Sequence, residues 1–120
     1  PKCAQGAENM TDSSDVRVIF CTVPDPGTGE RIARHLVEYR LAACVNVIPG
    51  VTSVYRWQGK VETGSEAILK IKSIEGRYHA LETAIRSQHP YELPEIIAVP
   101  VNGGLADYLD WIRVQHQEAP

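Results

Sequence analysis

A long β-hairpin is the feature that most limits how this chain can fold. Two runs rich in β-branched and aromatic residues begin at Val45 and end at Ser73, and only Gln58-Gly59 separates them. A two-residue connection with glycine in second place is typical of a tight hairpin turn, because glycine adopts positive φ without a steric penalty. The first arm would extend about 40 Å at ~3.3 Å per residue, roughly twice the length of an ordinary strand.

No other apolar run in the sequence is long enough to flank this hairpin along its whole length. Part of the hairpin must therefore extend beyond its own domain and carry Val54, Tyr55 and Trp57 with it. An apolar ribbon with open edges aggregates unless another chain covers it. We therefore expect an obligate oligomer in which the hairpin joins a neighbour's sheet, with Tyr55 and Trp57 as interface anchors.

The remaining apolar periodicity predicts one α+β domain built around this hairpin. The expected elements are a strand at residues 16–23, a helix from 26 to about 40, the two hairpin arms, a helix ending at 88, a strand at 95–101 and a last helix over about 105–114. This β-α-β-β-α-β order with an extra C-terminal helix predicts a ferredoxin-like split β-α-β sandwich. Its first and third strands are expected in the middle of the sheet, with all neighbouring strands antiparallel.

Smaller signals refine these elements. Asp25 before Pro26 is typical of a helix N-cap with proline in the first turn. Pro49-Gly50 predicts a bulge or bend inside the first hairpin arm. The final strand, over residues 95–101, is expected to be buried. The apolar faces expected of the three helices are Ile32, Leu36 and Val37; Tyr78, Leu81, Ala84 and Ile85; and Leu105, Tyr108, Leu109 and Ile112, with Trp111 beside the last face.

Length and charge limit the organisation and the partners. We expect a flexible N-terminal tail over residues 1–15, the domain over residues 16–114 and a polar C-terminal end over residues 115–120. The net charge is −3, without any Lys/Arg cluster, which disfavours nucleic acid and anionic membranes as partners. No apolar run approaches the ~20 residues of a membrane-spanning helix. A basic-then-apolar signal pattern is missing, so the expected compartment is the cytoplasm.

The predicted topology brings three kinds of metal-ligating side chain to one end of the sheet. The first strand ends near Cys21, and the last strand is entered through a segment that contains His89 and Glu95. Thiolate and imidazole suit copper or zinc, and the same trio is also compatible with a nucleophile, its base and an orienting carboxylate. A purely structural role, with a buried Cys21 and a His89 that caps a helix end, is the third interpretation. Cys44 belongs to the opposite end of the sheet, which disfavours a disulfide with Cys21.

Five short segments occur in a specific order and spacing. They are Cys21-Thr22-Val23-Pro24, Arg40-Leu41-Ala42-Ala43-Cys44-Val45-Asn46, Ile48-Pro49-Gly50, Tyr55-Arg56-Trp57-Gln58-Gly59-Lys60 and His89-Pro90-Tyr91-Glu92-Leu93-Pro94-Glu95. Together they resemble the CutA divalent-cation tolerance family, and the resemblance covers about residues 16–114.

That resemblance implies a ferredoxin-like fold assembled as a tight homotrimer, in which the long hairpins connect the three sheets. It also implies a role in tolerance to copper and other divalent cations, with copper or another divalent metal ion bound by Cys21, His89 and Glu95. Some members carry two adjacent histidines where this chain has Gln88-His89, so one candidate imidazole is absent here.

These observations lead to three hypotheses about function, none of them enzymatic. The first is a trimeric cytoplasmic protein that binds metal ions and supports metal tolerance. The second is a trimeric small-ligand sensor that resembles the nitrogen-regulatory signalling proteins in shape, and the third is an assembly scaffold for a partner protein. A hydrolase that uses Cys21 is the least supported, because no oxyanion-hole pattern lies beside that residue.

Overall fold

The structure of the protein is a computed structural model, which describes residues 15–117. Its elements are β1 (Val16–Val23), α2 (Pro26–Glu38), β2 (Cys44–Trp57), β3 (Lys60–Ile74), the 3-10 turn η2 (Glu75–Arg77), α3 (Tyr78–Gln88), β4 (Ile96–Pro100) and α4 (Ala106–Val114). This is the order that the sequence predicts. The tail expected over residues 1–15 lies outside the described residues except for Asp15, and so do residues 118–120 of the polar C-terminal end.

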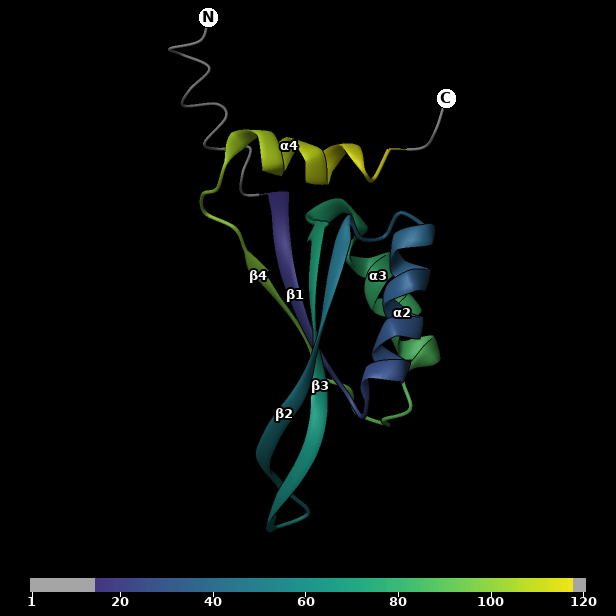
Figure 1. The fold of residues 1–120 in the computed structure, drawn as a ribbon, viewed down its shortest axis with the longest axis vertical. Coiled ribbons are helices and arrows are strands. Elements are labelled where there is room, and N and C mark those ends of the chain that lie inside the picture. Colours follow the sequence, from purple (N-terminus) through teal and green to yellow (C-terminus); the bar gives the residue numbers. More distant parts are fainter. Residues whose placement is uncertain (1–14, 118–120) are drawn as a thin grey trace, which may run out of the picture.

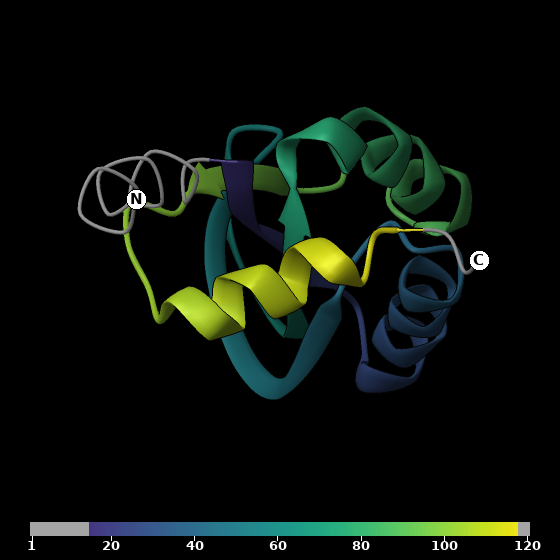
Figure 2. The same cartoon turned by 90° about the horizontal axis from the view of Figure 1, so that it is seen from above.

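The four strands form one antiparallel sheet in the order β2-β3-β1-β4. The first and third strands are therefore central, and the α+β prediction is confirmed. Helices α2 and α3 cover one face of the sheet, and α4 crosses one end of the strands (Figures 1 and 2). No helix within residues 15–117 is both long and apolar enough to cross a membrane.

The main core lies between the sheet and α2 and α3. Strand β1 turns every second side chain inward, because successive residues of a strand point to opposite faces. The fully buried members from the strands and helices are Ile19, Cys21, Val23, Ile32, Leu36, Ala67, Leu69, Ile71, Leu81 and Ile85. Each large aliphatic side chain buried in this way contributes about 1.5–3 kcal/mol to folding.

Helix α2 begins as predicted and approaches the sheet closely. Asp25 accepts a 2.8 Å hydrogen bond from the backbone N–H of Thr28, which confirms the N-cap. A Cβ on Gly29 would lie 3.0 Å from Leu69 Cδ2, so only glycine allows this spacing without a shift of the neighbours. Val37, predicted on the buried face, is 43% exposed. That assignment is wrong because α2 turns Gly29, Ile32, Ala33 and Leu36 toward the core instead.

The hairpin overhangs the body of the domain, as the sequence predicts. Strand β3 pairs with β1 only from Ala67 to Ile74, and residues 51–66 pair only within the hairpin. The overhang makes the molecule elongated, 57 Å in its longest dimension against 31 and 23 Å (Figure 1). Gln58 and Gly59 form the turn, both with positive φ, and the pairing register shifts between Ile48 and Val51, where the predicted bulge lies.

Two predictions of burial are wrong, both at the edges of the domain. Strand β4 is an edge strand, and its Ile97 and Val99 are exposed. Helix α4 buries Leu109 and Ile112 against Val16 and Ala43. The other residues of its predicted face, Leu105 and Tyr108, and the adjacent Trp111 are exposed. The reason is that α4 rests across the ends of the strands and contacts the domain along one side only (Figure 2).

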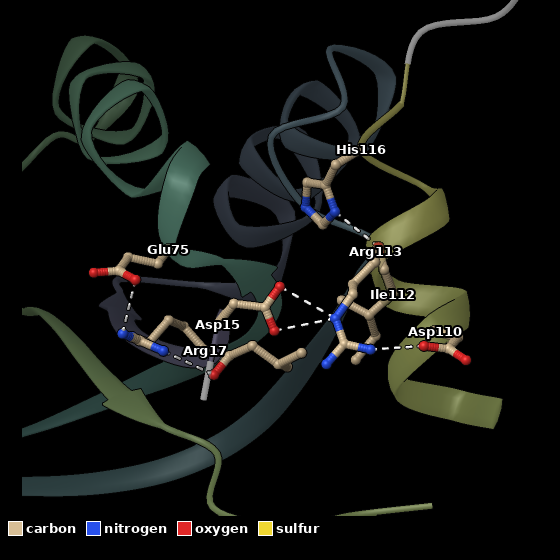
Figure 3. Close-up of polar contacts among 8 residues, drawn as sticks. Asp15, Arg17, Glu75, Asp110, Ile112, Arg113 and His116 are labelled. Atoms are coloured by element: carbon tan, nitrogen blue, oxygen red, sulfur yellow. Dashed lines mark hydrogen bonds and ion pairs between the residues drawn. The ribbon is translucent and has the colours of Figure 1, made fainter. Parts of the chain in front are cut away.

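Polar contacts hold α4 in that position (Figure 3). Arg113 Nε lies 3.1 Å from both carboxylate oxygens of Asp15, and its Nη1 lies 2.7 Å from Asp110. His116, which the sequence places in the polar C-terminal end, is buried. Its Nδ1 donates a 2.8 Å hydrogen bond to the carbonyl oxygen of Ile112, and its own carbonyl accepts a 2.7 Å bond from Arg77. The packed domain therefore extends past residue 114.

Candidate functional site

The end of β1 and the segment before β4 meet at Thr22. Cys21 is paired with Ile96 across the sheet, which places residues 89–95 beside the end of β1. The carbonyl oxygen of Thr22 lies 2.7 Å from His89 Nε2, and its hydroxyl donates a 2.8 Å hydrogen bond to Glu95 Oε1. The convergence of these two segments, predicted from topology, is confirmed.

The hydrogen bonds of His89 decide which of its nitrogens carries the proton. A carbonyl oxygen can only accept, so Nε2 must be the N–H that faces Thr22. The other nitrogen, Nδ1, accepts a 3.1 Å hydrogen bond from the backbone N–H of Tyr91. His89 as a whole residue is only 8% exposed, and its ring lies beside the Tyr91 ring at a centroid distance of 4.8 Å. Both nitrogens are therefore engaged within the chain.

The thiol of Cys21 belongs to the hydrophobic core. It is fully buried on the face of β1 that α2 and α3 cover. Burial, with a smaller effect from the negative charge of Glu95, raises the pKa of this thiol to about 12. Only a thiolate binds metal ions strongly. The next residue, Thr22, points to the opposite face of the strand. Its hydroxyl holds the carboxylate of Glu95 on that face. The sheet therefore separates the Glu95 carboxylate from the Cys21 thiol.

This arrangement does not fit a preformed metal site. The thiol is protonated, both imidazole nitrogens are engaged and Glu95 already accepts a hydrogen bond. Within residues 15–117 no group of three or more His, Cys, Asp and Glu side chains is placed to hold a metal ion. Gln88, at the position of the absent imidazole, folds back onto its helix and lies 3.4 Å from the carbonyl oxygen of Ala84. The assignment of Cys21, His89 and Glu95 as metal ligands stays a prediction.

A groove of about 900 Å³ adjoins Thr22 on the face of the sheet away from α2 and α3. The overhanging part of the hairpin forms one wall, and residues 90–95 form the other. The lining residues are Thr22, Ser53, Val54, Tyr55, Trp57, Glu66, Pro90, Tyr91, Glu92, Leu93 and Glu95. Sequence reasoning missed this groove, because the aromatic residues read as interface anchors and the glutamates as surface charges. Ser53, Tyr55 and Trp57 are spaced two residues apart and so point to the same face of the strand. This spacing was the sequence signal that the three side chains could line one wall of a groove.

One hydrogen bond joins the two walls of the groove. The hydroxyl of Tyr91 donates to Glu66 Oε2 at 2.5 Å. Burial, followed by this bond and the charge of Glu66, raises the pKa of Tyr91. The phenol therefore remains protonated and a donor at neutral pH, and it fixes the segment of residues 90–95 against the hairpin.

Comparison with known proteins identifies the family of this chain. A family model described as "CutA1 divalent ion tolerance protein" matches residues 17–115. The chain belongs to the CutA1 family. Its resemblance to the CutA proteins, first indicated by five short motifs, therefore extends over nearly the whole described domain.

Individual CutA relatives agree with this assignment. The "Divalent-cation tolerance protein CutA" of Pectobacterium atrosepticum is 48% identical over 99 residues, which cover 82% of this chain and 90% of the relative. "Protein CutA 1, chloroplastic" of Oryza sativa is 42% identical over 102 residues, but the match spans only 58% of that relative. The crystal structure of CutA from Xylella fastidiosa has a TM-score of 0.84 at 50% identity and covers 87% of this chain and 100% of that one. The fold of this chain is thus the CutA1 fold.

Proposed function

We propose that this protein is a cytoplasmic homotrimer that takes part in the tolerance of divalent cations by binding metal ions and catalyses no reaction. The observation that carries the proposal is the overhanging hairpin, in which Tyr55 and Trp57 are 46% and 48% exposed in the single chain. Aromatic residues of this kind, apolar with one polar atom, are enriched in subunit interfaces. Membership of the CutA1 family, named for divalent ion tolerance, supports the role of metal ions.

The face of the sheet away from α2 and α3 supports assembly as well. Directly paired residues of an antiparallel sheet point to the same face. Phe20 is paired with Ile97, and Val18 with Val99, so this face carries a contiguous apolar area next to the edge strand β4. Ile97 and Val99 are exposed in the single chain. Exposed apolar areas of this kind mark sites where another protein packs.

For the metal ion we propose Cys21, His89 and Glu95 as the ligands of copper or another divalent cation. All three lie around one residue, Thr22, and supply thiol, imidazole and carboxylate groups. Because the arrangement described above does not fit an ion, binding would require that His89 releases Thr22 or Tyr91, that Cys21 loses its proton, and that Glu95 leaves Thr22 and reaches the face of the sheet on which Cys21 lies. The proposal therefore depends on a local rearrangement of residues 89–95.

Two measurements test this proposal. Light scattering at micromolar concentration should give the mass of three chains, and a stable monomer would contradict the assembly. Calorimetric titration with copper and with zinc should show weaker binding in Cys21→Ala, His89→Ala and Glu95→Gln than in the wild type. Equal affinity in all four proteins, with folding checked by circular dichroism, would exclude these ligands.

The groove favours a second candidate function, that of a trimeric sensor of small ligands. Pockets of about 300–1,000 Å³ are the usual size for small-molecule sites, and this groove falls in that range. None of the described residues that line it is basic, so nucleotides and other anions are disfavoured. A thermal-shift screen with small molecules of both charges tests this candidate, and no stabilisation by any of them would remove it.

A further inference from the structure

We propose that Asn102 is a site of spontaneous covalent modification, at which deamidation through a cyclic imide gives isoaspartate and aspartate. Asn102 and Gly103 lie in the connection from β4 to α4, which has no regular secondary structure (Figure 1). Such a modification goes beyond the function proposed above, and it depends neither on the number of subunits nor on the metal ligands. It depends on the chemistry of two adjacent residues and on the elements that they connect.

The reaction needs only the chain and water. The backbone nitrogen of Gly103 attacks the side-chain carbonyl carbon, Cγ, of Asn102, and a cyclic imide forms. The carbon–nitrogen bond of the side-chain amide breaks, and its nitrogen leaves as ammonia with the proton that the Gly103 nitrogen gives up. Water then opens the imide at one of its two carbonyl carbons. Opening at the backbone carbonyl leaves isoaspartate, and opening at Cγ leaves aspartate.

The local structure leaves both reacting groups free to meet. Asn102 and Gly103 are exposed. Among residues 15–117, neither the side-chain amide of Asn102 nor the N–H of Gly103 has a hydrogen-bond partner. A Cβ built on Gly103 would meet no atom within 4 Å, so nothing crowds the attacking nitrogen. Glycine also restricts the backbone less than any other residue, which favours the closure of the imide.

Asn46, the other asparagine of the described residues, has the opposite surroundings. It lies within β2 and is paired with Lys70 of β3. Its side-chain oxygen accepts a hydrogen bond from Lys72 Nζ. The next residue is Val47, whose β-branched side chain restricts the backbone. Closure of an imide at Asn46 requires local opening of the sheet, so this residue is an internal control for Asn102.

The modification would fall between two fixed points of the chain. The N–H of Val101 donates a 3.0 Å hydrogen bond to the carbonyl oxygen of Val16. Gly104 lies against Leu109, where an added Cβ would be 3.2 Å from Cδ2, and Leu109 with Ile112 packs α4 on the domain. Isoaspartate routes the main chain through Cβ and Cγ of residue 102, which lengthens it by one carbon atom, and it adds a negative charge. We therefore expect α4 to pack less tightly after the modification.

Peptide mass spectrometry of the full chain, aged in its native assembly at pH 8 and 37 °C, tests the site. Trypsin releases Asn102 and Asn46 in separate peptides, residues 87–113 and 41–56, and a sample digested without incubation gives the starting level. The first peptide should gain about 1 Da as its amide becomes an acid, at a rate roughly tenfold or more above that of the second. Equal rates, or no conversion of Asn102 in the assembled protein, would overturn the proposal.

Gly103→Ala is the matched variant for the attacking nitrogen. Gly103 does not have a positive φ, and the added Cβ meets open space, so the fold should accept alanine. Alanine restricts the backbone, so conversion of Asn102 should slow several-fold. Asn102→Gln, which removes the reacting side chain, should give no mass gain over the same period. An unchanged rate in Gly103→Ala would overturn the proposal, because the reaction would then not pass through the Gly103 nitrogen.

Two further measurements identify the product and its effect on α4. Isoaspartyl methyltransferase methylates isoaspartate but not aspartate, and it should label the 87–113 peptide of the aged wild type but not that of Asn102→Gln. Absence of this label would contradict the imide. Amide hydrogen exchange in α4 should be faster in the aged than in the fresh wild type, with exchange in α2 unchanged. Equal exchange in α4 would contradict the predicted loss of packing.

Discussion

His89 and Thr22, 67 positions apart in the sequence, are joined by a 2.7 Å hydrogen bond from Nε2 to the carbonyl oxygen. The bond connects His89, the C-cap residue of α3, to Thr22, the second-last residue of β1. Since Nδ1 of the same ring accepts from the Tyr91 N–H, one imidazole holds both β1 and the segment that forms a wall of the groove. These two bonds give the side chain a structural role, which metal binding through His89 would disrupt.

Removal of the His89 side chain should destabilise the protein. His89→Ala leaves the carbonyl of Thr22 and the N–H of Tyr91 without these partners, at an expected cost of about 1–3 kcal/mol. Urea unfolding at one fixed protein concentration measures the change. His79→Ala, an exposed histidine of α3, is the matched control and should have little effect. Equal stability of the two variants would show that the His89 bonds contribute nothing to folding.

The Cys21 thiol should be inert in the folded protein. Its pKa, raised to about 12 mainly by burial, leaves almost no thiolate at pH 8, and the core excludes the reagent. In a Cys3→Ser/Cys44→Ser variant Cys21 is the only thiol, and Ellman's reagent should modify it only after denaturant is added. Fast modification of the native protein would mean that Cys21 is reachable from solvent, which would favour its proposed role as a metal ligand.

His116 should make the protein less stable as the pH falls. Burial, and next the positive charge of Arg77, lower the pKa of this imidazole below its ordinary value of 6.5, although hydrogen bonds and Asp15 oppose the shift. In the unfolded chain His116 therefore takes up a proton at a higher pH than in the folded chain. The free energy of unfolding must then decrease as the pH falls through 6.5 toward the lower folded value.

The contribution of His116 can be isolated by substitution. Thermal unfolding midpoints at pH 7.5 and pH 5.5 should differ less in His116→Gln than in the wild type, because the variant has lost this titrating group. His35→Gln on α2 is the control and should keep the wild-type difference. The same pH dependence in wild type and His116→Gln would contradict the assignment.

Assembly should depend on the aromatic residues of the hairpin. Buried aromatic anchors often contribute 2 kcal/mol or more each to an interface, so Tyr55→Ser/Trp57→Ser should lower the mass seen by light scattering at micromolar concentration. Tyr39→Ser, which removes an exposed tyrosine after the end of α2, should leave the mass unchanged. An unaltered mass in the double variant would place the subunit contacts elsewhere on the chain.

Much of the fold was predictable because it depends on local patterns. The turn at Gln58-Gly59, the bulge at Pro49-Gly50 and the Asp25 cap each follow from the conformational preferences of a few adjacent residues. The meeting of Cys21 with residues 89–95 was predictable too, since the order of elements leaves few allowed topologies. The exposure of Val37 and Trp111 was not, because periodicity shows which residues share a face but not how much of that face a neighbour covers.

The sequence by itself determined the hairpin, the order of the strands and the family, because these depend on residue spacing and on motifs. Only the tertiary structure decided that Cys21 faces the core while Glu95 lies on the other face, that both nitrogens of His89 are engaged, and that three glutamates and three aromatic rings surround one groove. Those properties depend on which face of β1 the helices cover and on contacts between residues far apart in the chain. Residue type and spacing along the sequence therefore do not predict these properties.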